Sequence, residues 1–477
     1  MIARLSAGWP RALVAALAGI AFASWALVAV AHLDDAWGND KVSGGWLVLG
    51  KAADEGTLYP PLFDGTHYGG TRWMPLPILA FAFAHRLGSN GYWSPKLLVY
   101  IIAIALFALL YLVLREVHAP RDIATGLVAL ALTVPVGFNA ATTIAGDALA
   151  TLLQLAAVTL VYRRREELTA RTLWLAALLC ALALLSKLSA VWAPLAIAIV
   201  LVALSLRSAL VFSAAVAAFL AVGLVLTELA SGGRFSENLF SLATAGGSGL
   251  HGLIVDAPTR LISRMQSLAG AIWLVAPLAV LAVLRRVAVR RITVFDVGFA
   301  LAIGTTVITF ADSGAYVNHL LDLVVLVPIL AGSLCALAVA EGAAFASLMR
   351  VAIVVALVGN LAIEIRPIAW EALNDLRAGS DARYGAELLR GVVTPEQTLL
   401  AQDPGVPYAL GRRPVVIDAF MLPRIADDHP RWVDALRGRI ERQEFDIVVL
   451  VNPVTYPPFY ADGDFGVSGR LSGTAEA

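Results

Sequence analysis

Long apolar segments alternate with short polar ones from residue 11 to residue 365. Eleven of them are long enough, or nearly so, to cross a hydrocarbon core of about 30 Å as a helix. They cover residues 11–31, 96–114, 123–138, 147–162, 172–186, 188–206, 209–229, 268–284, 295–311, 317–338 and 348–365. The fifth is short, and the break at Ser186-Lys187 could equally be a kink inside one helix. The pattern predicts an α-helical polytopic membrane protein of about eleven spans.

The arginines predict the orientation of these segments. With the N-terminus in the cytoplasm, arginine-rich stretches such as 163–165 and 285–291 fall in short cytoplasmic loops, as the positive-inside rule requires. The first segment is too long for the apolar core of a signal peptide and lacks a small-residue cleavage site, so we expect a retained anchor. An odd number of spans then places the C-terminal tail outside.

The first outer loop, residues 32–95, contains two further apolar stretches. Val42–Ala53 and Met74–Leu87 are too short to cross a membrane, and segments of this length are typical of interfacial or re-entrant helices. Trp46 and Trp73 fit the aromatic belt at headgroup depth. We expect two interfacial helices in this loop.

The composition changes after Arg366. Short β-type runs at 398–401, 414–417 and 446–451 alternate with helical stretches such as Trp432–Gln443. This alternation predicts a small extracytoplasmic α/β domain over residues 367–477, following a membrane domain over residues 1–366. The tail has no Gly-rich phosphate loop and no nucleophile elbow, so we assign it no catalysis.

Composition narrows the class of protein. The chain is 59% hydrophobic and 15% charged, where a soluble domain carries about 25% charged residues. A formal net charge of zero gives no field that favours nucleic acid. The two cysteines lie in apolar segments and form no disulfide or metal-ligand pattern. Only four of the 35 basic residues are Lys, which indicates a GC-rich bacterial genome and hence a bacterial cytoplasmic (inner) membrane.

Three carboxylates stand where an apolar segment meets the outer face. Asp34 and Asp35 follow the first segment, and Asp147 opens the fourth. Ionisable groups beside a bilayer are costly and are candidates for function. The alternative is helix capping, which is about as plausible for Asp147. For the Asp34-Asp35 pair function is favoured, because the pair ends a helix, where the dipole disfavours anions.

Two cations are candidates for binding a phosphate. Lys187 lies between two apolar segments at the predicted outer face, and its alternative is a lysine that snorkels to water. Arg72 lies among aromatic residues in the stretch His67–Pro75, and its fork of donors suits phosphate.

Two other regions give weaker signals. A Gly- and Ser-rich second outer loop, residues 231–266, contains His251 and Arg260; it suits a gate near a headgroup, and a plain connector fits equally well. Asn318 and His319 begin the tenth segment, where a lone His is usually structural.

No phosphate loop and no dinucleotide fingerprint is found on the cytoplasmic side. ATP-driven transport and nucleotide-sugar chemistry are therefore disfavoured.

Several short motifs together resemble the GT-C superfamily of membrane glycosyltransferases. Within it, the resemblance is to bacterial glycosyltransferase family 39-like proteins, which are similar to protein mannosyltransferases and to the lipid A aminoarabinose transferase. The motifs are the acidic pair, Gly56–Pro60, Met74–Pro77, Gly146–Ala150, Leu184–Lys187, Asn318–Leu321, Leu410–Val416 and Phe445–Val448. The chain departs from the family in reading Asp-Asp where Asp-Glu is usual, and Arg72-Trp73-Met74-Pro75 where Lys-Pro-Pro or Tyr-Pro-Pro is common.

The resemblance implies an inverting transfer of a sugar from a polyprenyl-phosphate donor to an envelope acceptor, which is a lipid, a glycan or a protein. Asp35 or Asp34 would act as general base, with Asp147 as the next candidate. The lipid phosphate would meet positive charge from Arg72, Lys187, His251 or Arg260, or from a bound divalent metal ion. The other expected substrate-binding residues are Tyr59, His67, Asn318 and His319.

Two other functions compete with this interpretation. A transporter or flippase of lipid-linked sugars predicts internal repeats and a site near the bilayer midplane, whereas the acids here gather at one face. A non-catalytic membrane scaffold would use the tail to bind an envelope partner.

Overall fold

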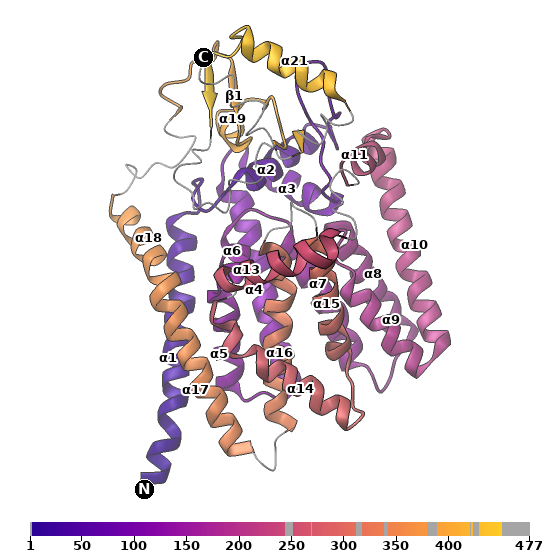
Figure 1. The fold of residues 1–477 in the computed structure, drawn as a ribbon, viewed down its shortest axis with the longest axis vertical. Coiled ribbons are helices and arrows are strands. Elements are labelled where there is room, and N and C mark those ends of the chain that lie inside the picture. The colour runs from indigo at the N-terminus through magenta and orange to yellow at the C-terminus, as the bar shows by residue number, and fades with distance from the viewer. Residues whose placement is uncertain are drawn as a thin grey trace.

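A long bundle of helices carries a layer of short helices and loops at one end, in the computed structural model of the chain (Figure 1). The structure describes residues 2–243, 251–268, 270–311, 317–337, 342–378, 389–419, 421–422 and 429–450. The bundle consists of α1 (Ile2–Ala31), α4 (Trp93–Glu116), α5 (Arg121–Thr133), α6 (Pro135–Thr142), α7 (Asp147–Arg163), α8 (Ala170–Ser186), α9 (Trp192–Leu204), α10 (Leu206–Ser231), α14 (Ala276–Ala288), α15 (Val294–Phe310), α16 (Leu321–Leu337) and α17 (Gly342–Asn360).

Each apolar segment predicted to span the membrane overlaps a helix of this bundle. Five described stretches are long and apolar enough to cross a membrane by themselves: Pro10–Ala31, Trp93–Glu116, Leu206–Ser231, Asn318–Cys335 and Ala346–Arg377. Ala170–Ser186, Trp192–Leu204 and Val294–Phe310 are shorter apolar helices. The total of eleven spans therefore stays a prediction.

The third predicted segment is not one straight helix. It is divided into α5 and α6, which are bent by 76° at Val134. Val134 is extended (φ −66°, ψ 145°), because the residue before Pro135 is disfavoured in the helical region. The bend directs α6 toward the end of the bundle at which α7 begins.

The bundle is held together by small and aliphatic side chains. One continuous buried cluster includes residues of α1, α4, α5, α7, α8, α9 and α14 to α17. At Gly126 of α5, an added Cβ would lie 2.7 Å from side-chain atoms of both Val14 and Ile353, so α1 and α17 approach this helix closely. Large apolar side chains such as Leu229 (72% exposed) and Ile308 (66% exposed) face outward, as expected of helices that meet lipid.

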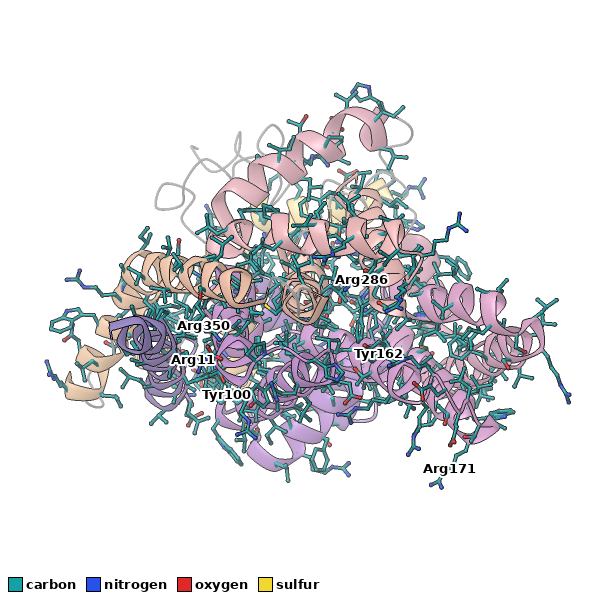
Figure 2. All side chains as sticks on the ribbon, turned by 90° about the horizontal axis from the view of Figure 1, so that it is seen from below. Arg11, Tyr100, Tyr162, Arg171, Arg286 and Arg350 are labelled. Carbon is teal, nitrogen blue, oxygen red and sulfur yellow. The ribbon has the colours of Figure 1, made fainter. Side chains whose placement is uncertain are left out.

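Two arginines, each paired with an aspartate, stabilise the end of the bundle that lies away from the layer of short helices. Figure 2 shows this end from below. Arg286 is buried and donates to both carboxylate oxygens of Asp296 and to Ser333. Arg350 is buried beside Asp122. A buried guanidinium is tolerated here because a carboxylate and further hydrogen bonds accompany it.

Two helices that pack side by side form the centre of this layer, called the outer layer below: α2 (Lys41–Asp54) and α3 (Pro75–Gly88). They occupy the two short apolar stretches predicted in the first loop. Asp40 caps α2 by accepting from the Ser43 N–H at 2.9 Å. The rings of Trp46 and Trp73 stack with centroids 4.2 Å apart and fix the loop between these helices.

Further short helices lie outside the bundle helices and before the C-terminal tail. They are α11 (Arg234–Ala243), η1 (Gly252–Asp256), α13 (Ala257–Leu268), η2 (Gly270–Leu274), η3 (Val317–Leu320), η4 (Leu361–Ile365) and α18 (Arg366–Ala378). The helix α18 continues α17 outward along α1 (Figure 1).

The C-terminal tail packs on the first loop. Its strands β1 (Leu399–Ala401) and β2 (Ile447–Val449) pair in parallel, and the tail also contains α19 (Gly405–Ala409) and α21 (Pro430–Glu441). The run 414–417, predicted as a third strand, instead forms a single parallel bridge from Val416 to Tyr68. Within the described residues, the tail therefore shares its packing with the first loop.

Candidate functional site

The turn after α1 holds Asp35 in a network of hydrogen bonds. The Oδ1 atom of Asp35 accepts from the Trp37 N–H at 2.8 Å and from the Lys96 ammonium at 3.2 Å, and its Oδ2 lies 2.8 Å from the His32 Nδ1. The bond to the backbone two residues ahead is the usual way in which Asp forms a turn. Burial opposes ionisation, but the His32 hydrogen bond and the Lys96 charge outweigh it and lower the pKa of Asp35.

Lys96 is the fully buried centre of this network. Its ammonium donates to the carbonyl oxygens of His32 (2.6 Å) and Trp37 (3.0 Å) as well as to Asp35. All three N–H groups of the ammonium therefore have an acceptor. The arrangement locks the turn onto the first turn of α4, and the sequence pattern gave Lys96 no role.

Helix α18 covers the same network from the other side. The Nε2 atom of His32 lies 3.7 Å from the Asp375 carboxylate, and the Trp37 ring stacks on the His32 ring at 4.5 Å. The Trp37 indole N–H donates to Glu371 at 3.3 Å. Sequence reasoning missed both α18 acids, because only the fold brings residues 371 and 375 beside residue 32.

Asp34 caps a helix. Its Oδ1 accepts from the N–H groups of Tyr92 (2.9 Å) and Trp93 (3.0 Å), where α4 begins. The capping alternative considered for these acids is thus present at Asp34, although the capped helix is α4. This role gives Asp34 a structural reason to be an acid.

Asp147, in contrast, lies in a cluster from three distant parts of the chain. Its Oδ1 lies 2.5 Å from the Lys187 ammonium and accepts from the Asn318 amide at 2.9 Å. Lys187 stands where α8 ends, and Asn318 stands in η3. His319 lies within electrostatic range of Asp147 and Lys187, and Arg72 lies within electrostatic range of His319. The fold therefore brings three of the residues predicted to bind substrate around one predicted acid, and Arg72 lies near the third of them, His319.

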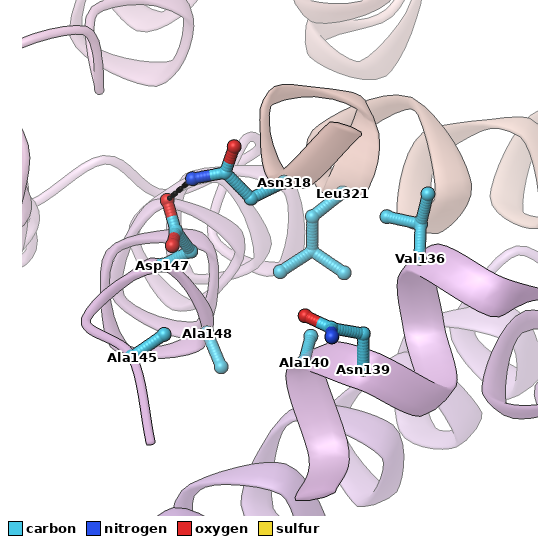
Figure 3. Close-up of a pocket in the computed structure, with 8 residues that line it drawn as sticks. All are labelled: Val136, Asn139, Ala140, Ala145, Asp147, Ala148, Asn318 and Leu321. Carbon is cyan, nitrogen blue, oxygen red and sulfur yellow. Dashed lines mark hydrogen bonds between the residues drawn. The ribbon is translucent and has the colours of Figure 1, made fainter. Parts of the chain in front are cut away.

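A hollow opens beside this cluster (Figure 3). The hollow is small, with room for about one water molecule. Asp147, Asn318 and Asn139 line it together with small and aliphatic side chains. The Oδ1 atom of Asn318 is buried and has no hydrogen-bond partner among the described residues. A carboxylate, an unused amide acceptor and a second amide suit a ligand rich in hydroxyl groups.

A second carboxylate lies one helical turn deeper. Asp322 of α16 accepts from the Thr151 hydroxyl at 2.7 Å and from the Gln154 amide at 3.4 Å. Lys187 lies within electrostatic range of Asp322 as well as of Asp147. The apolar pattern of α16 concealed Asp322 and that of α7 concealed Gln154.

The two acidic regions are neighbours. The Thr143 hydroxyl donates to the Gly38 carbonyl at 3.0 Å, and the Ile144 N–H donates to the Asn39 side chain at 3.2 Å. The first-loop turn therefore lies on the α6–α7 connection, which also lines the hollow.

Other residues predicted to bind substrate lie elsewhere. Tyr59 is buried, its φ is +58°, and its hydroxyl donates to the Trp73 carbonyl at 2.7 Å. His67 lies near Arg413 at the junction with the tail, where burial and the Arg413 charge lower its pKa. Arg260 lies 3.6 Å from Asp256 and donates to the Ala311 carbonyl, and His251 is exposed at the start of η1. These contacts do not join them to the Asp147 cluster.

A metal ion was a further candidate for the positive charge. Across the described ranges, no group of three or more His, Cys, Asp or Glu side chains is placed to hold one. The divalent metal ion stays a prediction, and no step below is routed through one.

Comparison with solved structures relates the fold to known proteins. No protein-family model matches the chain, and no curated protein matches its sequence. The chain is similar to ArnT from Cupriavidus metallidurans in its apo state, with 13% identity, 86% of each chain covered and a TM-score of 0.54. For ArnT from the same organism bound to undecaprenyl phosphate, the identity is 13%, 91% of each chain is covered and the TM-score is 0.55.

A third solved structure is an oligosaccharyltransferase from Archaeoglobus fulgidus in complex with Zn and sulfate. It is 12% identical, with 83% of this chain and 62% of that chain covered and a TM-score of 0.49. At such identities the likeness to ArnT shows the fold alone. The chain shares the fold of ArnT, which agrees with the GT-C resemblance seen in the sequence. Its five long apolar helices are those of a multi-pass membrane protein.

Proposed function

We propose that the chain transfers a sugar from a polyprenyl-phosphate donor to a hydroxyl group of an envelope acceptor at the outer face of the cytoplasmic membrane. The GT-C fold supports the class of reaction, and ArnT of the same fold was crystallised with undecaprenyl phosphate. The observation that carries the proposal is the Asp147 cluster, in which a carboxylate, an ammonium and an amide from three chain segments adjoin one hollow.

Asp147 is the carboxylate best placed to act as general base. Lys187 and Asn318 both contact its Oδ1, so its Oδ2 stays available to accept the proton of an incoming hydroxyl. The acceptor oxygen then bonds to the anomeric carbon as the bond from that carbon to the phosphate oxygen breaks. Attack opposite the leaving phosphate inverts the configuration at that carbon.

Lys187 and Arg72 are the proposed partners of the leaving phosphate. Negative charge grows on the phosphate as its bond to the sugar breaks, and nearby cations stabilise that charge. An ammonium has three N–H groups, so Lys187 can keep its contact with Asp147 while it also meets the phosphate. His319 and the unused Asn318 Oδ1 are placed to orient sugar hydroxyl groups.

Asp35, the base favoured by the sequence pattern, has a different setting. Donors meet both of its oxygens, Trp37 and Lys96 at Oδ1 and His32 at Oδ2, so neither oxygen is left for an incoming hydroxyl. We propose that Asp35 and Lys96 hold the first loop against α4. The choice between Asp147 and Asp35 is open to direct test.

The test is transfer of radiolabelled sugar from a panel of polyprenyl-phosphate donors, in membranes that carry wild type, Asp147→Asn, Asp35→Asn or Asp34→Asn. Loss of a general base lowers turnover by about 10²- to 10⁴-fold, and we expect this loss in Asp147→Asn at unchanged protein level. Asp434→Asn is the matched control, since Asp434 is an exposed acid of α21 whose described partner is Arg437.

Two results would contradict the assignment. Full activity in Asp147→Asn, with loss in Asp35→Asn at normal protein level, moves the base to the first loop. Retained configuration in the product, read from the anomeric proton by NMR, excludes a single displacement.

A further inference from the structure

Helix α11 binds the segment of the first loop that carries Arg72. Phe235, Asn238 and Leu242 recur at helical spacing and are buried, so they form one face of α11. The Phe235 ring meets the Tyr59 ring edge-on at 5.2 Å. Leu242 packs with Leu62 of the loop. The helix thus presents a mainly apolar face with one amide at its centre.

That amide, Asn238, has hydrogen bonds on both of its ends. Its Oδ1 accepts from the Thr71 N–H at 2.8 Å. Its Nδ2 donates to the carbonyl oxygens of Arg234 (2.8 Å) and Pro60 (3.4 Å). Asn238 and Thr71 are both buried, so water cannot replace these bonds.

Both neighbours of Arg72 are therefore fixed. On one side Asn238 holds the Thr71 N–H, and on the other side Trp73 donates its N–H to the Thr71 hydroxyl at 3.1 Å and accepts from the Tyr59 hydroxyl at 2.7 Å. Gly70, directly before, has a φ of +91°, and an added Cβ there would lie 3.4 Å from the Asn238 Oδ1. The backbone position of Arg72 depends on this packing.

The helices α10 and α11 also connect this region to Lys187, the second proposed partner of the phosphate. α11 follows α10 directly, and α10 packs along α8 and α9, whose connection carries Lys187. Figure 1 shows α10 at the side of the bundle with α11 at its outer end. Asn238 thus links α11, which continues from α10, to the loop that holds Arg72.

We propose that Asn238 is a positioning residue that sets Arg72 for contact with the donor's lipid phosphate. The inference rests on the proposed function, because it assigns that phosphate to Arg72 and Lys187. Asn238 acts through the Thr71 N–H and has no contact of its own with the ligand.

The test measures binding of undecaprenyl phosphate to purified full-length protein in detergent, and the donor KM and kcat of transfer. The variants are Asn238→Ala, Arg72→Ala and the double variant. We expect Asn238→Ala to raise the Kd and the donor KM about tenfold, as loss of one buried hydrogen bond allows, with kcat within about twofold of wild type. Ser236→Ala is the matched control, because Ser236 lies on α11 but bonds to Glu228 and Gly233 instead of the loop.

The double variant separates positioning from general weakening. If Asn238 acts through Arg72, adding Asn238→Ala to Arg72→Ala changes the Kd no further. If the two effects multiply, or if Asn238→Ala binds like wild type, the inference is wrong while the proposed function stands. If Arg72→Ala binds normally, or if wild type binds no undecaprenyl phosphate, the phosphate assignment fails and the inference fails with it.

A second variant, Asn238→Gln, keeps the test possible if Asn238→Ala does not fold. Asn238→Gln retains both hydrogen-bonding functions and is one methylene longer, so it displaces the Thr71 segment instead of releasing it. It takes the place of Asn238→Ala if that protein does not fold, with the same expected direction and the same dependence on Arg72.

Discussion

Replacing Lys96 by Met should destabilise the protein strongly. The substitution keeps an unbranched apolar stem but removes an ammonium that is fully buried and has three acceptors. Asp35 then loses its charged partner, and the carbonyl groups of His32 and Trp37 lose a donor. The substitution should lower the free energy of unfolding, because these groups cannot all reach water in the folded protein.

The loss in free energy of unfolding can be worked out from the contacts that the ammonium makes. Breaking a buried ion pair by removing one partner costs about 3–5 kcal/mol. Asp35 keeps its bonds to His32 and the Trp37 N–H, and 15% of its side chain is exposed, which places the cost near the lower end, about 3 kcal/mol. Since about 1.4 kcal/mol is a factor of ten, the unfolding equilibrium should shift by roughly a hundredfold.

Thermal melting in detergent, followed by tryptophan fluorescence, measures the effect. We expect the apparent Tm of Lys96→Met to fall by several degrees, and that of the control Lys51→Met to change by less than about one degree. Lys51 lies 4.0 Å from the exposed Glu55, the residue directly after its helix, and such a surface pair contributes about 0–1 kcal/mol.

A double variant tests the cause. Asp35→Asn combined with Lys96→Met leaves no unpaired buried charge, so its Tm should lie above that of Lys96→Met alone. A Tm equal to wild type in Lys96→Met, or no recovery in the double variant, would refute the reasoning.

Two further predictions concern the contact between the tail and α2. Burial raises the pKa of Asp403 from 3.8 to about 6, so the folded state binds this proton more tightly than the unfolded state does. The stability of the protein should therefore fall as the pH rises from about 4 to about 6, and it should level off above that. In a series of Tm measurements against pH, Asp403→Asn should remove this slope. Gly44→Ala would place a Cβ 2.3 Å from the backbone nitrogen of Gly405, so we expect a loss of about 1–3 kcal/mol and faster proteolytic release of the tail. Gly304→Ala, whose Cβ meets nothing within 4 Å, is the control and should leave both unchanged.

The sequence predicted the regular elements well, because they follow from local periodicity. Apolar segments of bilayer length identified the helices of the bundle, and the two shorter stretches of the first loop identified α2 and α3. The bend between α5 and α6 could have been predicted from Pro135, whose effect on the residue before it is local. The count of spans is less well determined, because helices such as α9 are short as well as apolar.

The candidate site was only partly predictable, because its contacts join distant residues. Asp147, Lys187 and Asn318 were each noticed as polar residues at the end of an apolar segment, and the fold brings them together. Nothing in the local pattern distinguished Asp34, which caps α4, from Asp35, which pairs with Lys96. The role of Asn238 was hidden too, since an Asn in a polar loop region gives no signal of its own.

The contacts between the first loop and the tail have a consequence for the order of biosynthesis. The Tyr68 hydroxyl donates to the Trp432 carbonyl, across 364 residues of chain, and Tyr68 also bridges to Val416. In the orientation that the arginines predict, the first loop is exported early. It must then wait, without these partners, until nearly the whole chain has been inserted and the tail has crossed the membrane. Contacts of such sequence separation form late and slowly. The outer layer can close only at the end of translation, so a truncated chain would reach the membrane with an open outer layer.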